Sequence, residues 1–416
     1  MHMKSFNLTT VLTVIVMVFC ISSCSMGDMY YDESGRGPAA SPPDSGDSEE
    51  EPGNEGENSQ AGKITAGEWN DLDNWAFWSG LMDGQNDYKF YEHLDYWNLY
   101  TYNRFAVTVL DGTQQPVCGA KVCLHENGAE EPSWTTITDN TGSAELWYRI
   151  DSSESDEERI FTASVNGKMH ETPLVRTSTT GEEAEINFLT AGQTSVTRSA
   201  DIAFIVDATG SMMDEIDFLK DDLLDIIRKA AAQQSGLSIR TAALFYRDEG
   251  DAYVTRSENF NKDPQKTLNF IKKQEANGGG DYPEAVHTAL EKALQDLSWE
   301  EGNYARLAFL LSDAPPHHNQ KVMESIRKSI ENYAANGIKL IPIAASGIDK
   351  STEFLLRLMA IFTDGTYVFI TNHSGIGNEH IEPTIGQYDV ELLNELIVRL
   401  IGKYTVMLPK TVGDVE

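Results

Sequence analysis

The chain has 416 residues, which is enough for two or three domains at roughly 100–200 residues each. Its 65 acidic residues outnumber its 32 basic ones and give a net charge of −33. A field of this sign repels phosphate backbones, so the composition excludes nucleic acid as a partner and favours divalent cations and basic surfaces.

Residues 1–23 have the layout of a secretory signal, with Lys4 in a polar start followed by an apolar stretch. That stretch is shorter than the roughly 20 residues that a membrane-spanning helix needs. Its end, "ISSC", resembles the bacterial lipobox, in which the signal is cut before the cysteine and the thiol receives a diacylglycerol. The resemblance implies a lipid anchor on Cys24. The alternative is an ordinary cleaved signal with an incidental cysteine.

The anchor would place the protein in the bacterial cell envelope. Ser25, which follows the cysteine where an aspartate could stand, resembles a signal for sorting to the outer membrane. The periplasmic and the outward-facing side of that membrane both stay open.

Residues 24–63 are dominated by Pro, Gly, Ser and carboxylates. Such a segment cannot bury enough apolar surface to offset the entropy lost on ordering, so we expect an acidic disordered tether. A patch for calcium or a basic partner at residues 47–51 is the alternative to a self-repelling linker.

Residues 64–101 contain four closely spaced tryptophans. Leu72, Trp75, Trp78 and Leu81 recur every three residues, which predicts a short amphipathic helix. Clustered tryptophans can form a sugar-stacking platform, but they are more often core residues. We therefore expect this segment to pack against the neighbouring domain.

Residues 102–190 change to short alternating runs separated by turn signals, which predicts a small antiparallel β-sandwich. The order "VTVLDG", "PVCGAKVCL" and "TDNTGSAEL" resembles carboxypeptidase-regulatory-like and other transthyretin-like modules. In an extended strand Cys118 and Cys123 would lie about 16 Å apart, too far for the ~5.5 Å that a disulfide requires. Unless residues 116–119 form a turn, we expect two unpaired and largely buried thiols.

From residue 199 to 406, apolar strands alternate with amphipathic helices. This alternation indicates a mostly parallel sheet covered on both faces, an α/β doubly wound, Rossmann-like fold. The chain is thus expected to be multidomain, with residues 407–416 as a C-terminal tail. In such sheets ligands gather at the carboxyl ends of the strands, near the point where strand order reverses.

Three places put oxygen ligands at that edge. Asp207, Thr209 and Ser211 follow the first strand, Asp281 lies in the loop "NGGGDYPEA", and Asp313 ends the strand "LAFLLSD". Alternate residues of an extended loop can point to one side, so the first loop can offer a carboxylate and two hydroxyls. Oxygen-only ligands suit a hard dication, of which Mg²⁺ is favoured and Mn²⁺ and Ca²⁺ are alternatives.

These residues resemble the metal-ion-dependent adhesion site of the von Willebrand factor A domain. Members place an Asp-x-Ser-x-Ser motif after the first strand, a Thr in a later loop and an Asp after the fourth strand. Asp207, Thr209, Ser211 and Asp313 match this order, and Thr209 keeps a hydroxyl where the family has serine. The resemblance implies that the hydroxyls bind the metal directly, that the aspartates act largely through water, and that one position awaits a carboxylate of a partner protein.

Asp281 stands where the family has its loop threonine. As a ligand it would put three carboxylates around a dication, for a net charge of about −1 that disfavours an acidic partner group. The alternative is that Asp281 caps the following helix, with Glu284 completing a capping box. Asp248, which ends the second strand, is expected to support the ligands without touching the ion. His317 and His318 are expected to be solvated loop residues.

Two other functions compete with a binding module. A haloacid-dehalogenase-like phosphatase also begins from an aspartate such as Asp207, but it needs a second aspartate two residues on, where this chain has Thr209. A nucleophilic Ser211 has no histidine assignable from the sequence. A passive surface protein would explain the tether and the sandwich but not the oxygen cluster. We therefore expect a membrane-anchored, metal-dependent module that binds another protein and is not an enzyme.

Overall fold

The computed structural model describes residues 62–84, 89–127, 129–154, 158–177, 185–233, 236–374 and 380–406. The predicted signal peptide, Cys24, the tether up to residue 61 and the tail at 407–416 lie outside the described residues. Within the described ranges, no helix is both long and apolar enough to cross a membrane.

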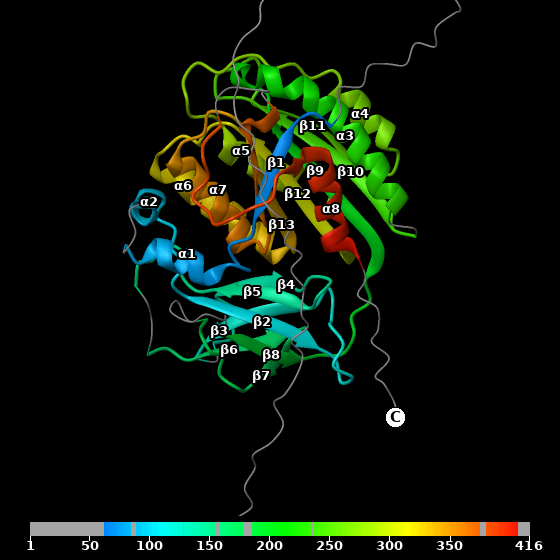
Figure 1. Ribbon diagram of the computed structural model, residues 1–416. Coiled ribbons are helices and arrows are strands. Elements are labelled where there is room, and N and C mark those ends of the chain that lie inside the picture. Colours follow the sequence, from blue (N-terminus) through cyan, green and yellow to red (C-terminus); the bar gives the residue numbers. More distant parts are fainter. Residues whose placement is uncertain are drawn as a thin grey trace, which may run out of the picture. The chain divides into compact units, whose positions relative to one another are not determined.

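An eight-stranded mixed sheet is the largest element (Figure 1). Its five central strands, in the order β10–β9–β12–β13–β14, run parallel, whereas β11 and β1 pair antiparallel with their neighbours. β15 pairs with the outer edge of β1. The strands are β11 Thr255–Asn261, β10 Ser238–Tyr246, β9 Thr197–Asp207, β12 Asn303–Ser312, β13 Ile338–Ala344, β14 Tyr367–Ile370, β1 Thr65–Trp69 and β15 Glu391–Leu392.

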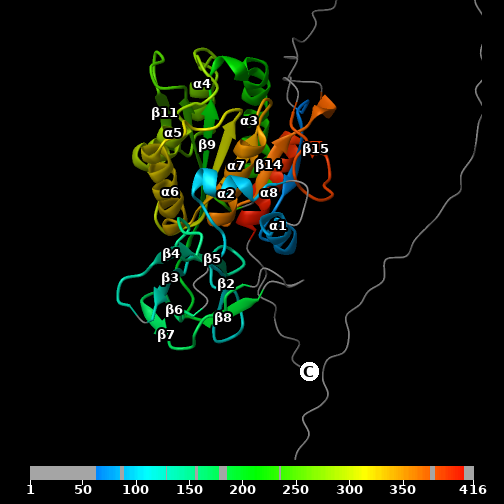
Figure 2. The same cartoon turned by 90° about the vertical axis from the view of Figure 1, so that its left-hand side faces the viewer.

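Amphipathic helices pack on both faces of this sheet (Figure 2). Ile202 and Phe204 of β9 share one apolar cluster with α3, α4 and α8, whereas Ala203 and Ile205 share the other with α5, α6 and α7. A strand buried on both faces has no polar side, which explains the continuous apolar run in its sequence. The helices are α3 Met213–Gln233, α4 Pro264–Ile271, α5 Val286–Asp296, α6 Gln320–Ala335, α7 Lys350–Phe362 and α8 Leu393–Thr405.

The segment at 64–101 contributes more than the predicted helix. Its first residues form β1, which pairs antiparallel with β14 and so extends the large sheet. Gly67 permits this close pairing, because a Cβ atom there would lie 2.5 Å from Cζ of Phe369. The sequence pattern did not predict this strand, because it is only five residues long and its pairing partner is about 300 residues away in the chain. Two short helices follow, α1 Trp75–Met82 and α2 Glu92–Trp97.

The tryptophans of this segment are core residues, as expected. Trp78 is fully buried and stacks on Phe354 of α7, with 5.7 Å between ring centroids. Trp75 lies 6.0 Å from Trp147, which belongs to β5. The segment therefore packs against two different parts of the chain and not against one neighbour alone.

Two smaller sheets occupy the chain between α2 and β9, with strand orders β5–β2–β8 and β4–β3–β6–β7. Their strands pair antiparallel except for β2 and β8, which run parallel, so the prediction of a purely antiparallel arrangement is wrong at that pair. Their side chains meet, since the rings of Phe105 on β2 and Phe161 on β6 are 5.0 Å apart. Cys118 and Cys123 are unpaired, as predicted; Cys123 is buried and Cys118 half-buried. The strands are β2 Arg104–Leu110, β3 Lys121–Glu126, β4 Trp134–Ile137, β5 Ser143–Trp147, β6 Phe161–Val165, β7 Lys168–His170 and β8 Ile186–Thr190.

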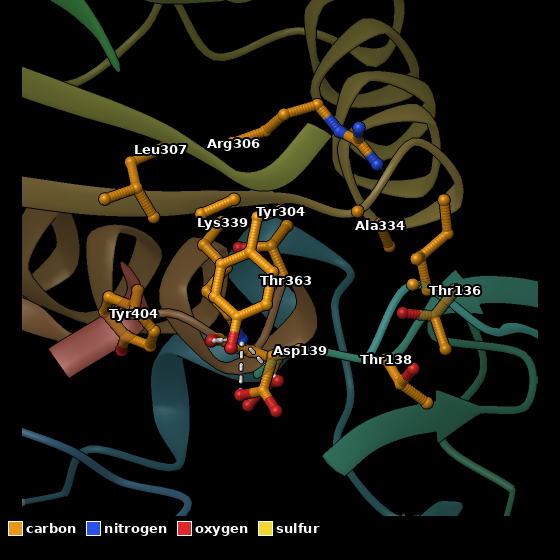
Figure 3. Close-up of a pocket in the computed structure, with 15 residues that line it drawn as sticks. Thr136, Thr138, Asp139, Tyr304, Arg306, Leu307, Ala334, Lys339, Thr363 and Tyr404 are labelled. Atoms are coloured by element: carbon orange, nitrogen blue, oxygen red, sulfur yellow. Dashed lines mark hydrogen bonds and ion pairs between the residues drawn. The ribbon is translucent and has the colours of Figure 1, made fainter. Parts of the chain in front are cut away.

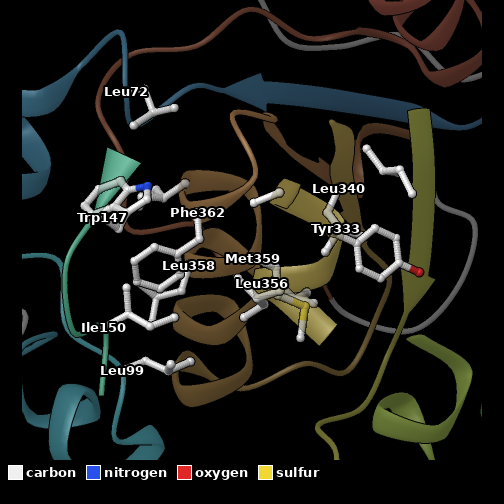
Figure 4. Packing of buried hydrophobic residues seen from close by; sticks show 14 of the residues in the cluster. Leu72, Leu99, Trp147, Ile150, Tyr333, Leu340, Leu356, Leu358, Met359 and Phe362 are labelled. Carbon is white, nitrogen blue, oxygen red and sulfur yellow. The ribbon is translucent and has the colours of Figure 1, made fainter. Parts of the chain in front are cut away.

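The small sheets contact the α/β part through apolar and polar groups. Trp147 lies edge-on against Phe362 of α7, at 5.0 Å between ring centroids (Figure 4). Lys339 Nζ lies 3.4 Å from a carboxylate oxygen of Asp139, beside a cavity of about 30 Å³ (Figure 3). Asn140 Nδ2 also donates to a main-chain carbonyl of α8 at 2.9 Å. The described residues belong to one compact unit.

Candidate functional site

The loop after β9 brings three of the predicted site residues together. Asp207, the last residue of the strand, is fully buried, and its Oδ1 accepts hydrogen bonds from the Thr209 amide at 2.9 Å and the Thr209 hydroxyl at 2.7 Å. The hydroxyls of Thr209 and Ser211 lie 3.2 Å apart. Thr209 is buried, whereas Ser211 is exposed. The turn thus presents one carboxylate and two hydroxyls, and only the outermost of these groups reaches solvent.

Asp313 lies at the same edge, on the neighbouring strand. β12 runs parallel to β9, with Leu311 opposite Val206, so both strands end side by side with an aspartate at the boundary. Asp313 is 4% exposed. Tyr246, at the end of β10, is fully buried and donates through its hydroxyl to Oγ of Ser312, the residue before Asp313, at 3.0 Å. Two carboxylates from different strands therefore converge where the parallel sheet predicts a ligand site.

The electrostatics of Asp207 are unusual. Burial and the negative charge of Asp313 raise the pKa of Asp207 to about 7, although hydrogen bonds from Thr209 act in the opposite direction. Its Oδ2 atom is buried and has no hydrogen-bond partner of normal geometry among the described residues, although Tyr246 lies close by. A buried carboxylate oxygen without a donor is costly, so this atom is a candidate for contact with a cation.

Asp281, unlike Asp207 and Asp313, is exposed, and it lies on the loop before α5. The helix begins at Val286 with Ala285 as its N-cap and no side-chain cap hydrogen bond. The alternative prediction, in which Asp281 caps the helix and Glu284 completes a capping box, is therefore wrong. The helix starts late because Glu284 is held in extended pairing: its amide donates to the carbonyl of Pro315 at 2.8 Å.

Glu284 is a buried residue at this edge that the sequence analysis gave only a capping role. It is 3% exposed, and its Oε2 has no hydrogen-bond partner in the described part of the chain. Burial raises the pKa of Glu284 to about 9, and the charges of Asp207, Asp248 and Asp313 add to the effect. In the sequence, a glutamate three residues after a loop aspartate is also typical of a capping box, so the pattern did not indicate that Glu284 belongs to the site.

Within the described part of the chain Asp248 makes no hydrogen bond to Asp207 or Thr209; it pairs with His317, whose Nε2 lies 2.7 Å from its Oδ1. His318 is not simply solvated, because its ring stacks on Tyr96 at 3.8 Å between centroids. Asp251 Oδ2 accepts from the Gly279 amide at 3.0 Å. These residues order the loops around the strand ends.

The donor set suits a hard dication. Asp207 and Asp313 supply two negative charges, and the Thr209 and Ser211 hydroxyls supply neutral oxygens, a combination typical of Mg²⁺, Mn²⁺ or Ca²⁺. Across the described residues, no group of three or more His, Cys, Asp or Glu side chains is arranged to hold a metal. A site at this edge would therefore depend on the hydroxyls as well as the carboxylates.

Comparison with known proteins locates a family match over this part. Residues 201–351 match the von Willebrand factor A domain. The chain is 30% identical over 130 residues to an ariadne-like RING finger protein of Acanthamoeba polyphaga mimivirus, and 30% identical over 141 residues to the alpha-protein kinase vwkA of Dictyostelium discoideum. These matches cover 31% and 34% of this chain but only 12% and 22% of those proteins.

Among solved structures, the chain is similar to the crystal structure of conserved hypothetical protein BatB from Bacteroides thetaiotaomicron, at 13% identity and a TM-score of 0.34. That match covers 49% of this chain and 98% of the other. The family match begins at Asp201 in β9 and runs past Asp313, so it contains the strand ends that carry the oxygen cluster. Residues 201–351 form a von Willebrand factor A domain.

Proposed function

We propose that this chain is a lipid-anchored envelope protein whose von Willebrand factor A domain binds another protein through a divalent cation, with Mg²⁺ as the proposed ion. The observation that carries the proposal is the buried Oδ2 atom of Asp207, which lacks a hydrogen-bond partner among the described residues beside the Thr209 and Ser211 hydroxyls. The domain type supports a role in protein interaction or adhesion.

The residues at the strand ends would divide the work. Thr209 and Ser211 would hold the ion through their hydroxyls, while Asp207 and Asp313 would balance its charge. Asp281, exposed on the loop before α5, is the proposed outer carboxylate. The bound cation would supply a Lewis-acidic position for an oxygen of the partner protein, and the exposure of Ser211 keeps that position open to solvent.

A binding role without chemistry is proposed for the same site. Thr209 occupies the position where a dehalogenase-like phosphatase needs its acid, and the Thr209 hydroxyl donates to Asp207. His317 pairs with Asp248, and among the described residues no hydrogen bond joins a histidine to the Ser211 hydroxyl, as activation of a nucleophilic serine would require.

The remaining parts complete the proposed surface protein. Cys24 would carry the lipid, the acidic tether would extend the folded part from an outer membrane, and the two small sheets would form a carboxypeptidase-regulatory-like sandwich. The α/β part would have a doubly wound fold, with the proposed site at the carboxyl end of β9. Cys24→Ala should release the protein from the membrane fraction or leave its precursor uncut. A processed variant that stays membrane-bound would refute the anchor.

Thermal melts with Mg²⁺, Mn²⁺ or Ca²⁺ test the metal site. Ion at a hundred times its dissociation constant adds about 2.7 kcal/mol of stability. We expect this gain in the wild type and in Asp217→Ala, which removes an exposed carboxylate from α3, and its loss in Asp207→Ala. The absence of any shift in the wild type with all three ions would refute the site. Pull-downs from envelope extract with and without chelator would then test for a metal-dependent partner.

A further inference from the structure

Glu284 is a buried carboxylate at the strand-end edge that the proposed ligand set leaves unused. It is 3% exposed and makes no ion pair with any Lys or Arg among the described residues. A buried glutamate is normally paired with a cation or fully hydrogen-bonded, yet one oxygen of this carboxylate has no hydrogen-bond donor in the described chain. The burial of this carboxylate without a counter-charge therefore indicates a role at the strand-end edge.

The backbone holds Glu284 against the Asp207 loop from two sides. Its amide donates to Pro315, two residues after Asp313, and this ties it to the end of β12. On the other side Gly279, with φ at +71°, sits between Glu284 and Thr209: a Cβ atom there would lie 2.8 Å from Glu284 Oε1 and 3.2 Å from Thr209 Cβ. A side chain larger than hydrogen would separate the two residues.

The same loop is fastened to the turn after β9. The Gly210 amide donates to the carbonyl of Gly278 at 3.1 Å, and the Asn277 amide donates to the carbonyl of Ala208 at 3.0 Å. These main-chain bonds hold the loop that leads to Glu284 against the turn, and the charge of Asp207 is close enough to contribute to the raised pKa of Glu284. Two buried carboxylates with unpartnered oxygens thus come from separate loops to one edge.

We propose that Glu284 is a third acidic member of the cation site, and that its charge directs the site toward a partner oxygen without negative charge, such as a main-chain carbonyl, an amide or a hydroxyl. This inference rests on the proposed function. A bound dication favours the ionised form of Asp207, Asp313 and Glu284, whose three negative charges leave these buried groups and the ion at −1, and the proposed outer carboxylate Asp281 adds to that negative charge. A carboxylate from a partner would then meet net repulsion instead of a neutral site.

Among the described residues no group of three or more His, Cys, Asp or Glu side chains is arranged to hold a metal, so Glu284 is proposed to act together with the Thr209 and Ser211 hydroxyls and not to bind the ion through carboxylates alone. Removal of the Glu284 charge should therefore weaken the site without abolishing it. Groups that act on a metal from behind its direct ligands typically change affinity by about 10- to 100-fold.

Calorimetric titration of the full chain with Mn²⁺ tests the assignment. We expect Glu284→Gln to bind Mn²⁺ about 10- to 100-fold more weakly than the wild type. Glu291→Gln, which makes the same change at an exposed position of α5, should bind like the wild type. Equal affinity in Glu284→Gln and wild type would overturn the inference. No Mn²⁺ binding in the wild type would instead overturn the proposed function, so the two failures are distinct. Melting curves in chelator check that each variant is folded.

Acetate serves as the probe for the partner group. Displacement of Mn²⁺-bound water by acetate lowers the water proton relaxation rate of the loaded protein. We expect acetate to displace water at lower concentration in Mn²⁺-loaded Glu284→Gln than in the loaded wild type, because the variant site is closer to neutral. Equal or tighter acetate binding by the wild type would refute the proposed preference.

Discussion

Buried carboxylates in this molecule have two kinds of surroundings. In the middle of α7, Arg357 is fully buried and binds Asp71 through Nε at 2.9 Å and Nη2 at 2.6 Å, and its guanidinium lies 3.4 Å from Glu353. At the carboxyl ends of β9 and β12, neither Asp207 nor Glu284 makes an ion pair with a Lys or Arg in the described part of the chain.

The same pairing recurs elsewhere in the molecule. Buried Arg104 binds Glu145 at 2.7 Å, and Lys339 lies between Asp139 and Asp364 where the small sheets meet the large one (Figure 3). A buried charge without a counter-charge destabilises the fold by several kcal/mol, so proteins rarely keep one without reason. Around Arg357, Arg104 and Lys339 the chain thus supplies its own cation for buried carboxylates. At the ends of β9 and β12 it supplies none to Asp207 or Glu284 among the described residues, and we propose an ion from solution there.

The largest effect on stability is expected from removal of the internal cation, Arg357. Arg357→Met leaves Asp71 and Glu353 buried without their counter-charge, which should lower the free energy of unfolding by about 3–5 kcal/mol. Denaturant unfolding in chelator measures it. Adding Asp71→Asn to this variant should cost less than the sum of the single changes, because the second change removes an unpaired charge. Additive losses would contradict the pairing.

An identical substitution at the two regions should have opposite signs in chelator at pH 8. Asp71→Asn should destabilise by about 2–3 kcal/mol, because Asp71 accepts charged hydrogen bonds from Arg357 and one from the Trp69 indole at 3.0 Å. Asp207→Asn should stabilise the metal-free protein by about 1 kcal/mol or more, since it relieves repulsion with Asp313. Thermal and denaturant unfolding decide it, and destabilisation by both changes would remove the contrast.

Asp222 on α3 is another buried carboxylate with an oxygen that has no hydrogen-bond partner among the described residues, and its effect on stability depends on pH. It is buried and accepts from the Gly62 amide at 2.6 Å, and burial, with Asp225 and Asp221 nearby, raises its pKa from 3.8 to about 6. Between pH 4 and 6 the folded protein keeps a proton that the unfolded chain has released, so stability falls as the pH rises through that window. Asp222→Asn should reduce this fall by about 1 kcal/mol or more. Equal pH profiles for variant and wild type would refute it.

The smallest effect is expected where charges face water. Lys89 and Glu92 form a 3.9 Å pair with side chains 71% and 55% exposed. Lys89→Met should change the free energy of unfolding by at most about 0.5 kcal/mol, because solvent screens exposed pairs. If Lys89→Met lowered the free energy of unfolding as much as Arg357→Met does, burial would not determine how much an ion pair contributes to stability.

Local sequence patterns predicted much of the fold. The apolar run before Asp207 predicted a strand buried on both faces, and the repeating strands and helices after residue 199 predicted the helix-covered sheet that the structure shows. The same patterns missed β1. Its five residues acquire strand character from pairing with β14, and a short run with an internal glycine carries little periodic signal of its own.

The candidate site divides in the same way. Asp207, Thr209 and Ser211 are neighbours in the chain, so their spacing alone placed them on one turn, and the structure joins them by hydrogen bonds of 2.7 to 3.2 Å. Their role as metal ligands stays a prediction. The roles of the two carboxylates before α5 could not be predicted from the local sequence, because Asp281 and Glu284 both suit a cap or a ligand. The hydrogen bond between the Glu284 amide and Pro315 holds Glu284 in its buried position.

By itself the sequence determined the alternation of strands and helices, the burial of the tryptophans and the turn that carries Asp207, because each depends on residues within one or two turns of chain. Only the tertiary structure decided that residues 65–69 complete the large sheet, that Arg357 neutralises Asp71, and that Glu284 instead of Asp281 faces inward. These outcomes depend on contacts between residues far apart in the chain, and their free energy comes from burial and charge pairing that no local pattern records.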